Sequence, residues 1–314
     1  MLAAAILITV IQSYPLFEEY THKYHKTYLD EEKQYREDIF MNNYRLLKQL
    51  NATLISSTVD VSMFSDMTPE EIAQYFHPLI PIQSGNPQTI NTTYNDTTLP
   101  DWRAAGKVSP VKFQGSCSAC YAFAAISTVE SLYAIQTGQL VEFSEQELID
   151  CATIYGSRGC GGGWVGVYDY IKSYGIHLEE DYAPFMSYFE GRCLNNINIP
   201  PFYKIKGYLT VPPYDNDALL SALRENPVWV TAYVSRTEFL NYKSGILDLP
   251  DCGVLPQHAL TLVGAGTENG VDFWLIKNSW SMLWGDKGYI KLKRESGKSI
   301  GMCGINLYGF YPYN

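Results

Sequence analysis

Apolar and polar positions follow two different periods along this chain. Residues 16–51 and most of residues 100–195 repeat apolar positions at a helical spacing, whereas apolar and polar positions alternate from Tyr203 onward. The first region predicts two helices, the second of them over about residues 30–51. The second region predicts a helix of about four turns from Cys120 to near Gly138, then short helices that begin with a capping-box pattern at residues 144–147 and that cover residues 165–174.

The alternating part of the chain predicts β-strands. Strands are expected over residues 204–211, 228–234, 258–264, 271–277 and 288–293, with one helix near residues 217–225. The chain is therefore expected to be an α+β protein with a helical lobe over about residues 110–205 and an antiparallel sheet or barrel lobe over about residues 206–314. Because clefts between lobes are common binding sites, the functional groups are expected where the two lobes meet.

The first hundred residues contain two stretches of unusual composition. Residues 1–13 form an apolar run that is too short to span a bilayer and is typical of a secretory signal peptide. No run of about 18 apolar residues follows, so no membrane span is expected. Residues 78–100 are rich in Pro, Ser, Thr and Asn, which predicts an exposed linker. We therefore expect a removable segment over residues 14–98 and a working domain over residues 99–314.

Charge and cysteine content narrow the class of protein. The formal net charge of −10 argues against a nucleic-acid partner, which needs a basic face. Seven cysteines begin only after the linker, and an odd number in an oxidising compartment is most simply three disulfides and one free, reactive thiol. Such a protein would enter the secretory pathway and end in a lysosome, a food vacuole or the extracellular space. No cofactor or metal is expected, and the chain is expected to be a monomer.

The helix over residues 30–51 carries an unusual stripe. Its members follow one another at steps of three or four residues and so share one helical face: Glu32, Arg36, Phe40, Asn43, Leu47 and Asn51. The first two stand four residues apart with the acid first, which is the favourable order for an ion pair. This mixture of polar and aromatic residues predicts a helix that crosses another segment and is locked by side-chain hydrogen bonds. A plain amphipathic helix with a solvated edge would also fit.

Candidate chemistry begins at Cys120. The stretch from Gln114 to Phe123 is a tight loop that runs into the apolar helix, with Cys120 at its first turn. Unpaired amides and the positive end of the helix dipole favour an anion there, so the thiol is expected to be shifted towards thiolate, which is a strong nucleophile. Such a nucleophile needs a base and a site for an oxyanion.

His258 is the candidate base. Three of the five histidines precede the linker, and a fourth, His177, lies in a helix-to-loop region where a structural role is expected. His258 opens a predicted strand and can therefore face the cleft. Asn278, 20 positions later, can accept from one imidazole nitrogen, fix the tautomer and turn the other nitrogen towards the thiol. The neighbouring Trp280 would shield that hydrogen bond from water.

These residues together resemble the papain family of cysteine peptidases, in its cathepsin L-like branch. The nucleophile loop is similar to the family motif, and His258 and Asn278 follow Cys120 by 138 and 158 positions. The stripe on the helix over residues 30–51 resembles the inhibitory pro-segment motif of this branch, and residues 101–103 resemble the start of the mature domain. The resemblance covers the chain from about residue 16 to its end.

The resemblance implies a papain-like two-lobe fold preceded by a helical pro-segment, and a cysteine endopeptidase made as a zymogen. Cys120 would be the nucleophile and His258 the base, forming a thiolate–imidazolium pair, with Asn278 as the orienting residue. The side chain of Gln114 and the amide of Cys120 would form the oxyanion hole. Proteins or peptides would be the substrates, and the chain's own pro-segment would be an intramolecular inhibitor. The implied disulfides are Cys117–Cys160, Cys151–Cys193 and Cys252–Cys303.

The resemblance also implies how substrate is held. Gly162 and Gly163 resemble the backbone edge that pairs with an extended peptide. The pocket for the side chain two residues before the cut would be lined by Trp164, Val165, Thr231, Ala259 and, at its base, Tyr308. Because no acidic residue stands at that base, an apolar side chain is expected there rather than Arg. No insertion resembling an exopeptidase occluding loop follows Cys160, which favours an endopeptidase.

Several positions depart from the family pattern. Ser118 replaces Gly in the nucleophile loop, where it would crowd the backbone if the position needs a positive φ. Tyr121 replaces the commoner Trp, Ser281 replaces Gly, and Leu47 stands where Ile is usual. A second pro-segment motif is degraded, because the usual Gly, Asn, Phe and Asp are here Asp60, Ser62, Phe64 and Asp66. These departures bear on the tightness of self-inhibition, not on the chemistry.

Three other functions remain open on the sequence. The stretch from Cys117 to Cys120 could be a CxxC redox or metal site, although no second metal-ligand cluster accompanies it and Cys160 is an available partner for Cys117. A non-catalytic binding homologue would keep the fold, but the intact set of Cys, His, Asn and Gln speaks against it. Ligase activity could arise from the same thioester intermediate.

Overall fold

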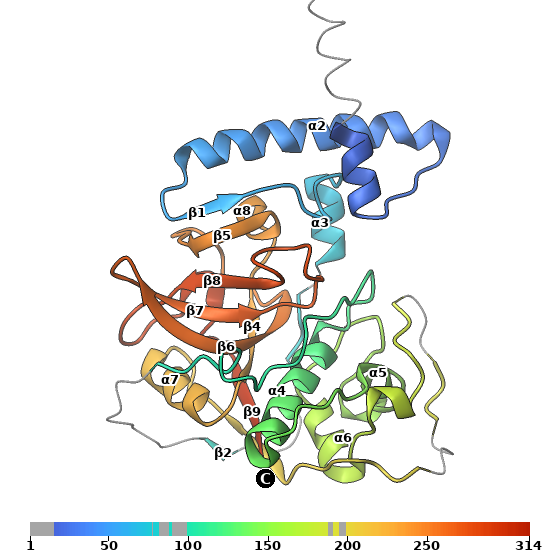
Figure 1. Ribbon diagram of the computed structural model, residues 1–314, viewed down its shortest axis with the longest axis vertical. Coiled ribbons are helices and arrows are strands. Elements are labelled where there is room, and N and C mark those ends of the chain that lie inside the picture. The colour runs from blue at the N-terminus through green and yellow to red at the C-terminus, as the bar shows by residue number, and fades with distance from the viewer. Residues whose placement is uncertain (1–15, 77, 82–87, 90–98, 188–190, 195–198) are drawn as a thin grey trace, which may run out of the picture.

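The computed structural model describes residues 16–76, 78–81, 88–89, 99–187, 191–194 and 199–314. It has three parts: a helical lobe, a sheet lobe, and an N-terminal segment (residues 16–81) whose helices lie at the top of the molecule in Figure 1, above the sheet lobe. The signal peptide expected at residues 1–13 and most of the expected linker lie outside the described residues.

The helical lobe is built around α4 (Cys120–Thr137). Every residue from Cys120 to Leu132 is buried, because this apolar helix packs both against the other helices and against the sheet. The helix ends at Gly138, whose φ of 79° lies in the left-handed region that glycine adopts readily. The rest of the lobe comprises α5 (Glu145–Cys151), α6 (Val167–Tyr174) and the 3-10 turns η1 (Thr153–Tyr155) and η2 (Glu179–Asp181).

The sheet lobe holds most of a nine-stranded sheet with the order β1-β5-β8-β7-β6-β4-β9-β3-β2. Neighbouring strands are antiparallel, except that β5 pairs in parallel with β8 and β2 pairs in parallel with β3. The elements that the alternating pattern predicts are present as β3 (Gly207–Thr210), α7 (Asn216–Glu225), β4 (Val228–Ala232), β6 (His258–Glu268), β7 (Val271–Lys277) and β8 (Tyr289–Lys293).

Other elements were not predicted, because they are short or contain Gly or Pro. They are β1 (Ser57–Val59), α3 (Pro69–Tyr75), β2 (Gln88–Thr89), α8 (Thr237–Leu240), β5 (Tyr242–Leu247), η3 (Met302–Gly304) and β9 (Gly309–Tyr313). β5 contains Gly245 in a left-handed conformation, and β9 contains Pro312, so neither has a clear alternating pattern. Their strand conformation depends on pairing with partners that are distant in sequence.

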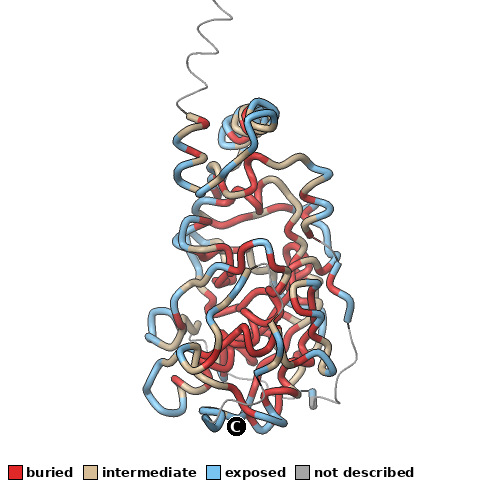
Figure 2. Tube along the Cα trace, turned by 90° about the vertical axis from the view of Figure 1, so that its right-hand side faces the viewer, coloured by how far each residue is buried: buried red, intermediate tan, exposed pale blue. Residues whose placement is uncertain are grey.

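Two apolar clusters form the body of the protein. One fills the sheet lobe and includes Leu223 of α7, Leu262 of β6 and Trp274 of β7. The other surrounds α4 and extends to Trp229 and Ala259 of the sheet. Figure 2 shows the buried positions concentrated in the two lobes, whereas the helices of the N-terminal segment at the top are largely exposed or half-buried. Because the second cluster crosses from helix to sheet, it fixes α4 against β6.

The N-terminal segment has a small aromatic core and a set of ion pairs that join α2 to α3. Phe40 of α2 (Asp30–Thr53) packs on Tyr20 of the first helix (residues 16–23), with ring centroids 4.5 Å apart. On the same face of α2, Arg36 pairs with Glu32 at 2.7 Å and with Glu71 of α3 at 2.8 Å. The predicted stripe on α2 therefore joins α2 to the chain that follows it through side-chain contacts.

The two asparagines of the stripe hold backbone instead of side chains. The Asn43 amide donates to the carbonyls of Ser65 at 2.9 Å and Met67 at 3.0 Å. Asn51 both donates to the carbonyl of Val59 at 2.7 Å and accepts from its N–H at 2.8 Å. These bonds fix β1 and the loop before α3 beneath α2, and β1 in turn pairs with β5 of the sheet lobe.

Asp66 is the polar centre of the N-terminal segment. Its buried carboxylate accepts from the Tyr20 hydroxyl at 2.7 Å, the Tyr28 hydroxyl at 2.6 Å and the Lys26 ammonium at 2.9 Å. Burial opposes its ionisation, but Lys26 and the two tyrosine hydrogen bonds lower the pKa of Asp66 below its ordinary value. The segment is therefore most stable with this carboxyl ionised.

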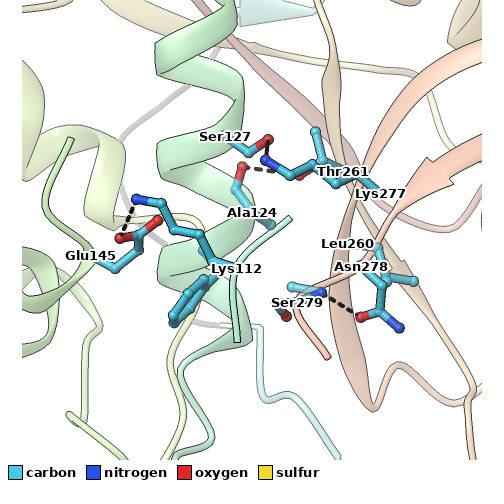
Figure 3. A pocket seen from close by; sticks show the side chains of 11 residues that line it. Lys112, Ala124, Ser127, Glu145, Leu260, Thr261, Lys277, Asn278 and Ser279 are labelled. Atoms are coloured by element: carbon cyan, nitrogen blue, oxygen red, sulfur yellow. Dashed lines mark hydrogen bonds and ion pairs between the residues drawn. The ribbon is translucent and has the colours of Figure 1, made fainter. Parts of the chain in front are cut away.

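A buried ionic cluster joins the two lobes around a cavity of about 10 Å³ (Figure 3). On one side, Lys112 contacts Glu145 of α5 at 3.0 Å, and burial raises the pKa of that carboxyl to about 8 although Lys112 opposes the rise. On the other side, Lys277 at the end of β7 donates to Ser127 of α4 at 3.2 Å and to Ser109 at 2.9 Å. Buried groups of this kind favour one arrangement of the lobes, because any other leaves buried polar groups without their partners.

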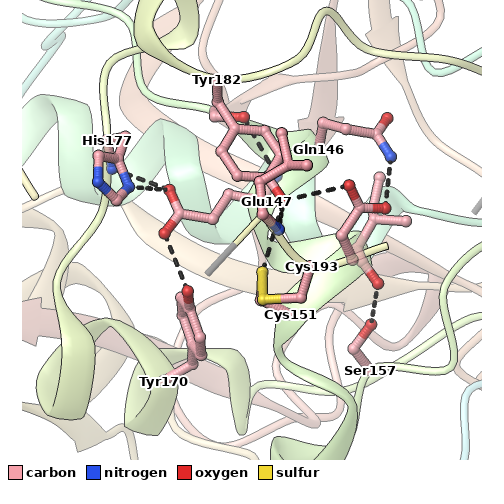
Figure 4. The surroundings of a disulfide bond; sticks show 12 residues. Gln146, Glu147, Cys151, Ser157, Tyr170, His177, Tyr182 and Cys193 are labelled. Carbon is pink, nitrogen blue, oxygen red and sulfur yellow. Dashed lines mark hydrogen bonds and ion pairs between the residues drawn. A yellow bond between two sulfur atoms is a disulfide. The ribbon is translucent and has the colours of Figure 1, made fainter. Parts of the chain in front are cut away.

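A second polar cluster lies beside the Cys151–Cys193 disulfide (Figure 4). The buried Glu147 carboxylate accepts from the Tyr170 hydroxyl at 2.9 Å and lies 3.0 Å from Nδ1 of His177. It also accepts from the His177 backbone N–H at 2.9 Å. His177 therefore has the structural role that its position in the sequence suggests.

None of the helices among the described residues is long and apolar enough to cross a membrane. Within the same residues, no group of three or more His, Cys, Asp or Glu side chains could hold a metal ion.

Replacing Lys277 with Met should lower the stability of the folded chain by about 3 kcal/mol, because the buried hydroxyls of Ser109 and Ser127 lose the ammonium that they contact. The buried Glu130 carboxyl, which accepts from Ser109, also loses a cation that opposes the rise of its pKa. The measurement is the urea midpoint by tryptophan fluorescence, in a Cys120→Ala background that cannot cleave itself. Lys172→Met on the exposed surface of α6 is the matched control and should change the midpoint little. Equal midpoints for the two variants would show that the cluster does not stabilise the fold.

Candidate active site

Cys120 is the free cysteine of the chain, and its thiol lies at the first turn of α4. The other six cysteines form the pairs that the resemblance implies, Cys117–Cys160, Cys151–Cys193 and Cys252–Cys303. Because Cys117 is bonded to Cys160, it is not a partner for Cys120, and the CxxC arrangement of a redox or metal site is not formed. The Cys120 thiol is therefore available for nucleophilic chemistry.

His258 approaches from the sheet lobe. It is the first residue of β6, opposite Ala232 of β4, and it is buried. Its Nε2 lies 2.8 Å from Oδ1 of Asn278, so the imidazole proton is assigned to Nε2 and Nδ1 remains as the basic nitrogen. Cys120, His258 and Gln114 line one cavity of about 40 Å³. The structure thus brings the candidate nucleophile, base and oxyanion donor together.

Trp280 covers the imidazole. The Trp280 and His258 rings lie 4.7 Å apart between centroids and are inclined by 32°. Trp280 and Asn278 are both buried, at 1% and 3% exposure. Phe64 of the N-terminal segment packs edge-on against the same indole at 4.8 Å. This arrangement is suited to keeping water from the hydrogen bond between His258 and Asn278.

Gln114 is held by the residue that follows Asn278. Its backbone N–H donates to the Ser279 carbonyl at 2.9 Å, and its Oε1 accepts from the Ser279 hydroxyl at 2.5 Å. Nε2 donates one hydrogen to the Cys117 carbonyl at 2.8 Å, which leaves its second hydrogen for a substrate oxygen. Ser279 also donates its N–H to Oδ1 of Asn278 at 2.8 Å. Our sequence reasoning missed Ser279, and its place beside Asn278 was the signal that could have found it.

Burial sets the charge state of the candidate pair. It raises the pKa of the Cys120 thiol to about 11, although backbone hydrogen bonds at Ala259, Tyr121 and Cys120 itself oppose the rise. It also lowers the pKa of His258 to about 4, against the opposing effect of the hydrogen bond to Asn278. Between these values both groups are neutral. In this covered state burial therefore acts on the thiol in the direction opposite to the helix terminus, and the thiolate that the sequence predicts stays a prediction for the uncovered site.

The cover is the end of the N-terminal segment. The Tyr75 hydroxyl donates to the Gly115 carbonyl at 2.7 Å, and the Leu79 N–H donates to the Pro256 carbonyl at 2.7 Å. Tyr75, Phe76 and Leu79 line the cavity that holds the candidate nucleophile and base. The segment thus bridges both lobes directly over the site, where an extended substrate would have to lie.

The expected substrate edge lies beside the same cavity. Gly162, with a φ of 95°, lines it, and a Cβ atom added to Gly163 would lie 2.7 Å from the Tyr121 ring. That ring is fixed, because the Tyr121 hydroxyl lies 2.6 Å from the Ser157 hydroxyl and donates to the Gly159 carbonyl at 3.1 Å. Tyr121 therefore explains why glycine is required at position 163.

The expected specificity pocket is partly assembled. The Trp164 and Tyr308 rings meet edge-on at 5.0 Å, and Thr231 of β4 pairs across the sheet with Ala259 of β6. The expected pocket residues Trp164, Val165 and Ala259 belong to the apolar cluster around α4, and Tyr308 packs against that cluster. Leu79 of the N-terminal segment belongs to the same cluster. An apolar side chain of the segment thus joins the surface that was expected to take an apolar substrate side chain.

Two departures from the family pattern are accommodated locally. Ser118 is not in a positive-φ conformation, and its N–H donates to the Cys160 carbonyl at 3.2 Å, so the expected crowding does not occur. Ser281 does have a positive φ, of 64°. Its hydroxyl accepts from the Leu283 N–H at 3.1 Å, a local hydrogen bond of the kind that makes turns tolerable for serine.

Two family models match the chain. The papain family cysteine protease model matches residues 97–313, which contain both lobes. The cathepsin propeptide inhibitor domain model matches residues 17–72, which contain the first helix, α2 and β1.

Known proteins match over nearly the whole chain. Fruit bromelain from Ananas comosus is 37% identical over 306 residues, covering 94% of this chain and 85% of the relative. Papain from Carica papaya is 37% identical over 311 residues, covering 95% and 86%. The solved structure of digestive procathepsin L 3 from Tenebrio molitor larval midgut superposes with a TM-score of 0.86 at 29% identity, covering 96% of this chain and 99% of that one. The chain therefore belongs to the papain family of cysteine proteases and carries a propeptide inhibitor domain ahead of the protease domain.

Proposed function

We propose that Cys120 attacks the scissile carbonyl of a protein or peptide and that His258, oriented by Asn278, acts as base and then as acid. One observation carries the proposal: the free thiol shares a cavity with an imidazole whose Nε2 is already held by Asn278, which leaves Nδ1 for the thiol. The spare N–H of Gln114 and the amide of Cys120 would stabilise the oxyanion, a contribution that is typically worth about a hundredfold in rate.

The reaction runs through a thioester. The Cys120 sulfur bonds to the carbonyl carbon, the His258 imidazolium protonates the leaving amine as the C–N bond breaks, and the new amino terminus departs. His258 then takes a proton from water, whose oxygen attacks the thioester, releases the acid and regenerates the thiol. An amine in place of water would give ligation, which the same residues could support. A non-catalytic role would leave this complete arrangement of groups without a use.

The chemistry needs the site to be uncovered. Removing the cover returns water and substrate dipoles to Cys120 and His258, so that the proton can pass from sulfur to imidazole and form the ion pair. We therefore propose a zymogen from which residues 14–98 are cleaved, leaving residues 99–314 as the working enzyme. Inhibition would be intramolecular, as the propeptide inhibitor domain indicates.

We further propose that the chain enters the secretory pathway through a signal peptide at residues 1–13 and acts as a monomer in a lysosome, a food vacuole or the extracellular space. Three disulfides support an oxidising compartment.

The Cys120 thiol should react slowly in the zymogen and fast after processing. With its pKa raised and that of His258 lowered, the covered pair holds almost no thiolate at pH 6, so alkylation by iodoacetamide should be slower by about tenfold or more. Peptide mapping should find the label on Cys120 alone, and Cys120→Ser should remove it. Equal rates before and after processing would contradict a neutral, covered pair.

Asp66→Asn should let the zymogen process itself at a higher pH than the parent. Because the folded pKa of Asp66 is lowered, its stabilising effect is complete above the ordinary Asp pKa and is lost as the pH falls through the lowered value. Asn removes the charge at every pH and leaves Lys26 unpaired, which should cost about 2–3 kcal/mol. Processing followed on gels from pH 7 to pH 3.5 should begin at higher pH, while exposed Glu70→Gln should behave like the parent. An unchanged pH profile would show that the charge of Asp66 does not help to hold the segment over the site.

The processed enzyme should prefer an apolar side chain two residues before the cut. Fluorogenic peptides with Leu, Val or Phe at that position should be cleaved at least about tenfold faster than the Arg peptide, because the pocket offers no carboxylate. Tyr308→Glu should raise the relative rate for Arg, and Tyr308→Phe is the matched control that should not. A wild-type preference for Arg would show that these residues do not form the pocket.

A further inference from the structure

Arg158 is a cation held in place at the edge of the active-site cleft. Its backbone N–H donates to the Gly162 carbonyl at 2.8 Å, and its own carbonyl accepts from the Gly161 N–H at 3.0 Å. The turn over residues 158–162 is closed further by the Cys117–Cys160 disulfide, which ties it to the loop before α4. The position of the Arg158 backbone is therefore as well defined as that of the substrate edge itself.

The guanidinium lies beside that edge. A Cβ atom added to Gly162 would have Nη2 of Arg158 as its nearest neighbour, at 3.9 Å. Arg158 lines the same cavity as Cys120 and His258, and its side chain is exposed. Apart from Arg158, Cys120 and His258, the residues that line the cavity are apolar, amide or hydroxyl residues. A group bound along Gly162 would therefore meet the Arg158 cation before any other charged side chain of the lining.

Arg158 has no carboxylate partner among the described residues, unlike four other arginines of the protein. Carboxylates lie within 3.3 Å of Arg36, Arg103, Arg236 and Arg294. The part of the N-terminal segment that lines the cavity does not supply one either, because Tyr75, Phe76, Pro78 and Leu79 carry no charge. In a chain with a net charge of −10, this unmatched cation at the cleft marks a site that can receive a carboxylate from outside.

We propose that Arg158 is a specificity-determining residue that favours Asp or Glu three residues before the cut. This inference rests on the proposed pairing of substrate with Gly162 and Gly163. In that pairing, the second residue before the cut lies along Gly163 and its side chain enters the apolar pocket. The third residue before the cut then lies along Gly162. Because side chains alternate along an extended chain, the third side chain points away from the pocket and towards the rim. Arginine matches a carboxylate there with two parallel hydrogen bonds.

The effect is expected to be moderate. Arg158 is exposed, and exposed ion pairs change rates by about two- to fivefold. It should also be sensitive to salt, because added ions screen exposed charges within about 10 Å at 0.1 M and within about 3 Å at 1 M. An apolar contact to the arginine stem would instead be insensitive to salt.

The test compares kcat/KM of the processed enzyme for three peptides. They have Glu, Gln or Lys as the third residue before the cut, and all of them have Leu as the second. Wild type should cleave the Glu peptide about two- to fivefold faster than its isosteric Gln peptide, and the Lys peptide more slowly still. Arg158→Gln should bring the Glu/Gln ratio to one, and Arg158→Glu should reverse it. Added salt should shrink the ratio in wild type alone.

Lys172→Gln is the matched control, because it removes the same charge from the exposed end of α6. If it lowers the Glu/Gln ratio as much as Arg158→Gln does, the net charge of the enzyme is responsible and the proposal is overturned. A ratio of one in wild type overturns it as well. Failure of the proposed peptidase chemistry would look different, since then none of the peptides, including the neutral one, would be cleaved.

Discussion

Removal of water from Cys120 and His258 is the constraint on which the rest of this structure depends. Both groups are buried, and burial alone drives the thiol and the imidazole towards their neutral forms. The helix terminus that carries Cys120 favours the thiolate, so the helix dipole and burial act on this thiol in opposite directions. Reactivity is therefore controlled by access of water and substrate, and the N-terminal segment controls that access.

Because the two reacting groups come from different lobes, their meeting depends on how the lobes are joined. Lys277 immediately precedes Asn278 and reaches Ser127 of α4, the helix that begins with Cys120. Ser279, on the other side of Asn278, holds Gln114 of the loop before α4. The orienting residue is thus flanked by two side chains that both cross to the helical lobe. Buried polar contacts add little net stability but exclude other arrangements, which is what a two-lobe site requires.

Much of the site could be predicted from sequence because its chemistry is local. Cys120 follows a tight loop and opens an apolar helix, and His258 opens an apolar strand, so each can be placed on its element from the neighbouring residues alone. The stripe on α2 was predicted for the same reason, since helical period shows which residues share a face. These are properties of short stretches of chain.

The remaining features depend on contacts between distant stretches. β1 has three residues and exists because β5, far along the chain, accepts it as an edge strand. Leu79 lies in a segment with the composition of a linker, yet it is buried because the cleft offers it an apolar surface. The raised pKa of Cys120 likewise comes from residues that no local pattern joins to it. Periodicity shows which face of an element is apolar but not what covers that face.

Tyr121 shows how closely the nucleophile and the substrate edge are coupled. It follows Cys120 in α4, and its ring fills the space that a side chain at position 163 would need. Its hydroxyl contacts Ser157 and Gly159, which lie in the loop that carries Arg158 and the glycines of the edge. A movement of α4 would therefore shift the thiol and the edge together. The distance between the nucleophile and the substrate edge is then set by the contact of one ring with Gly163, Ser157 and Gly159.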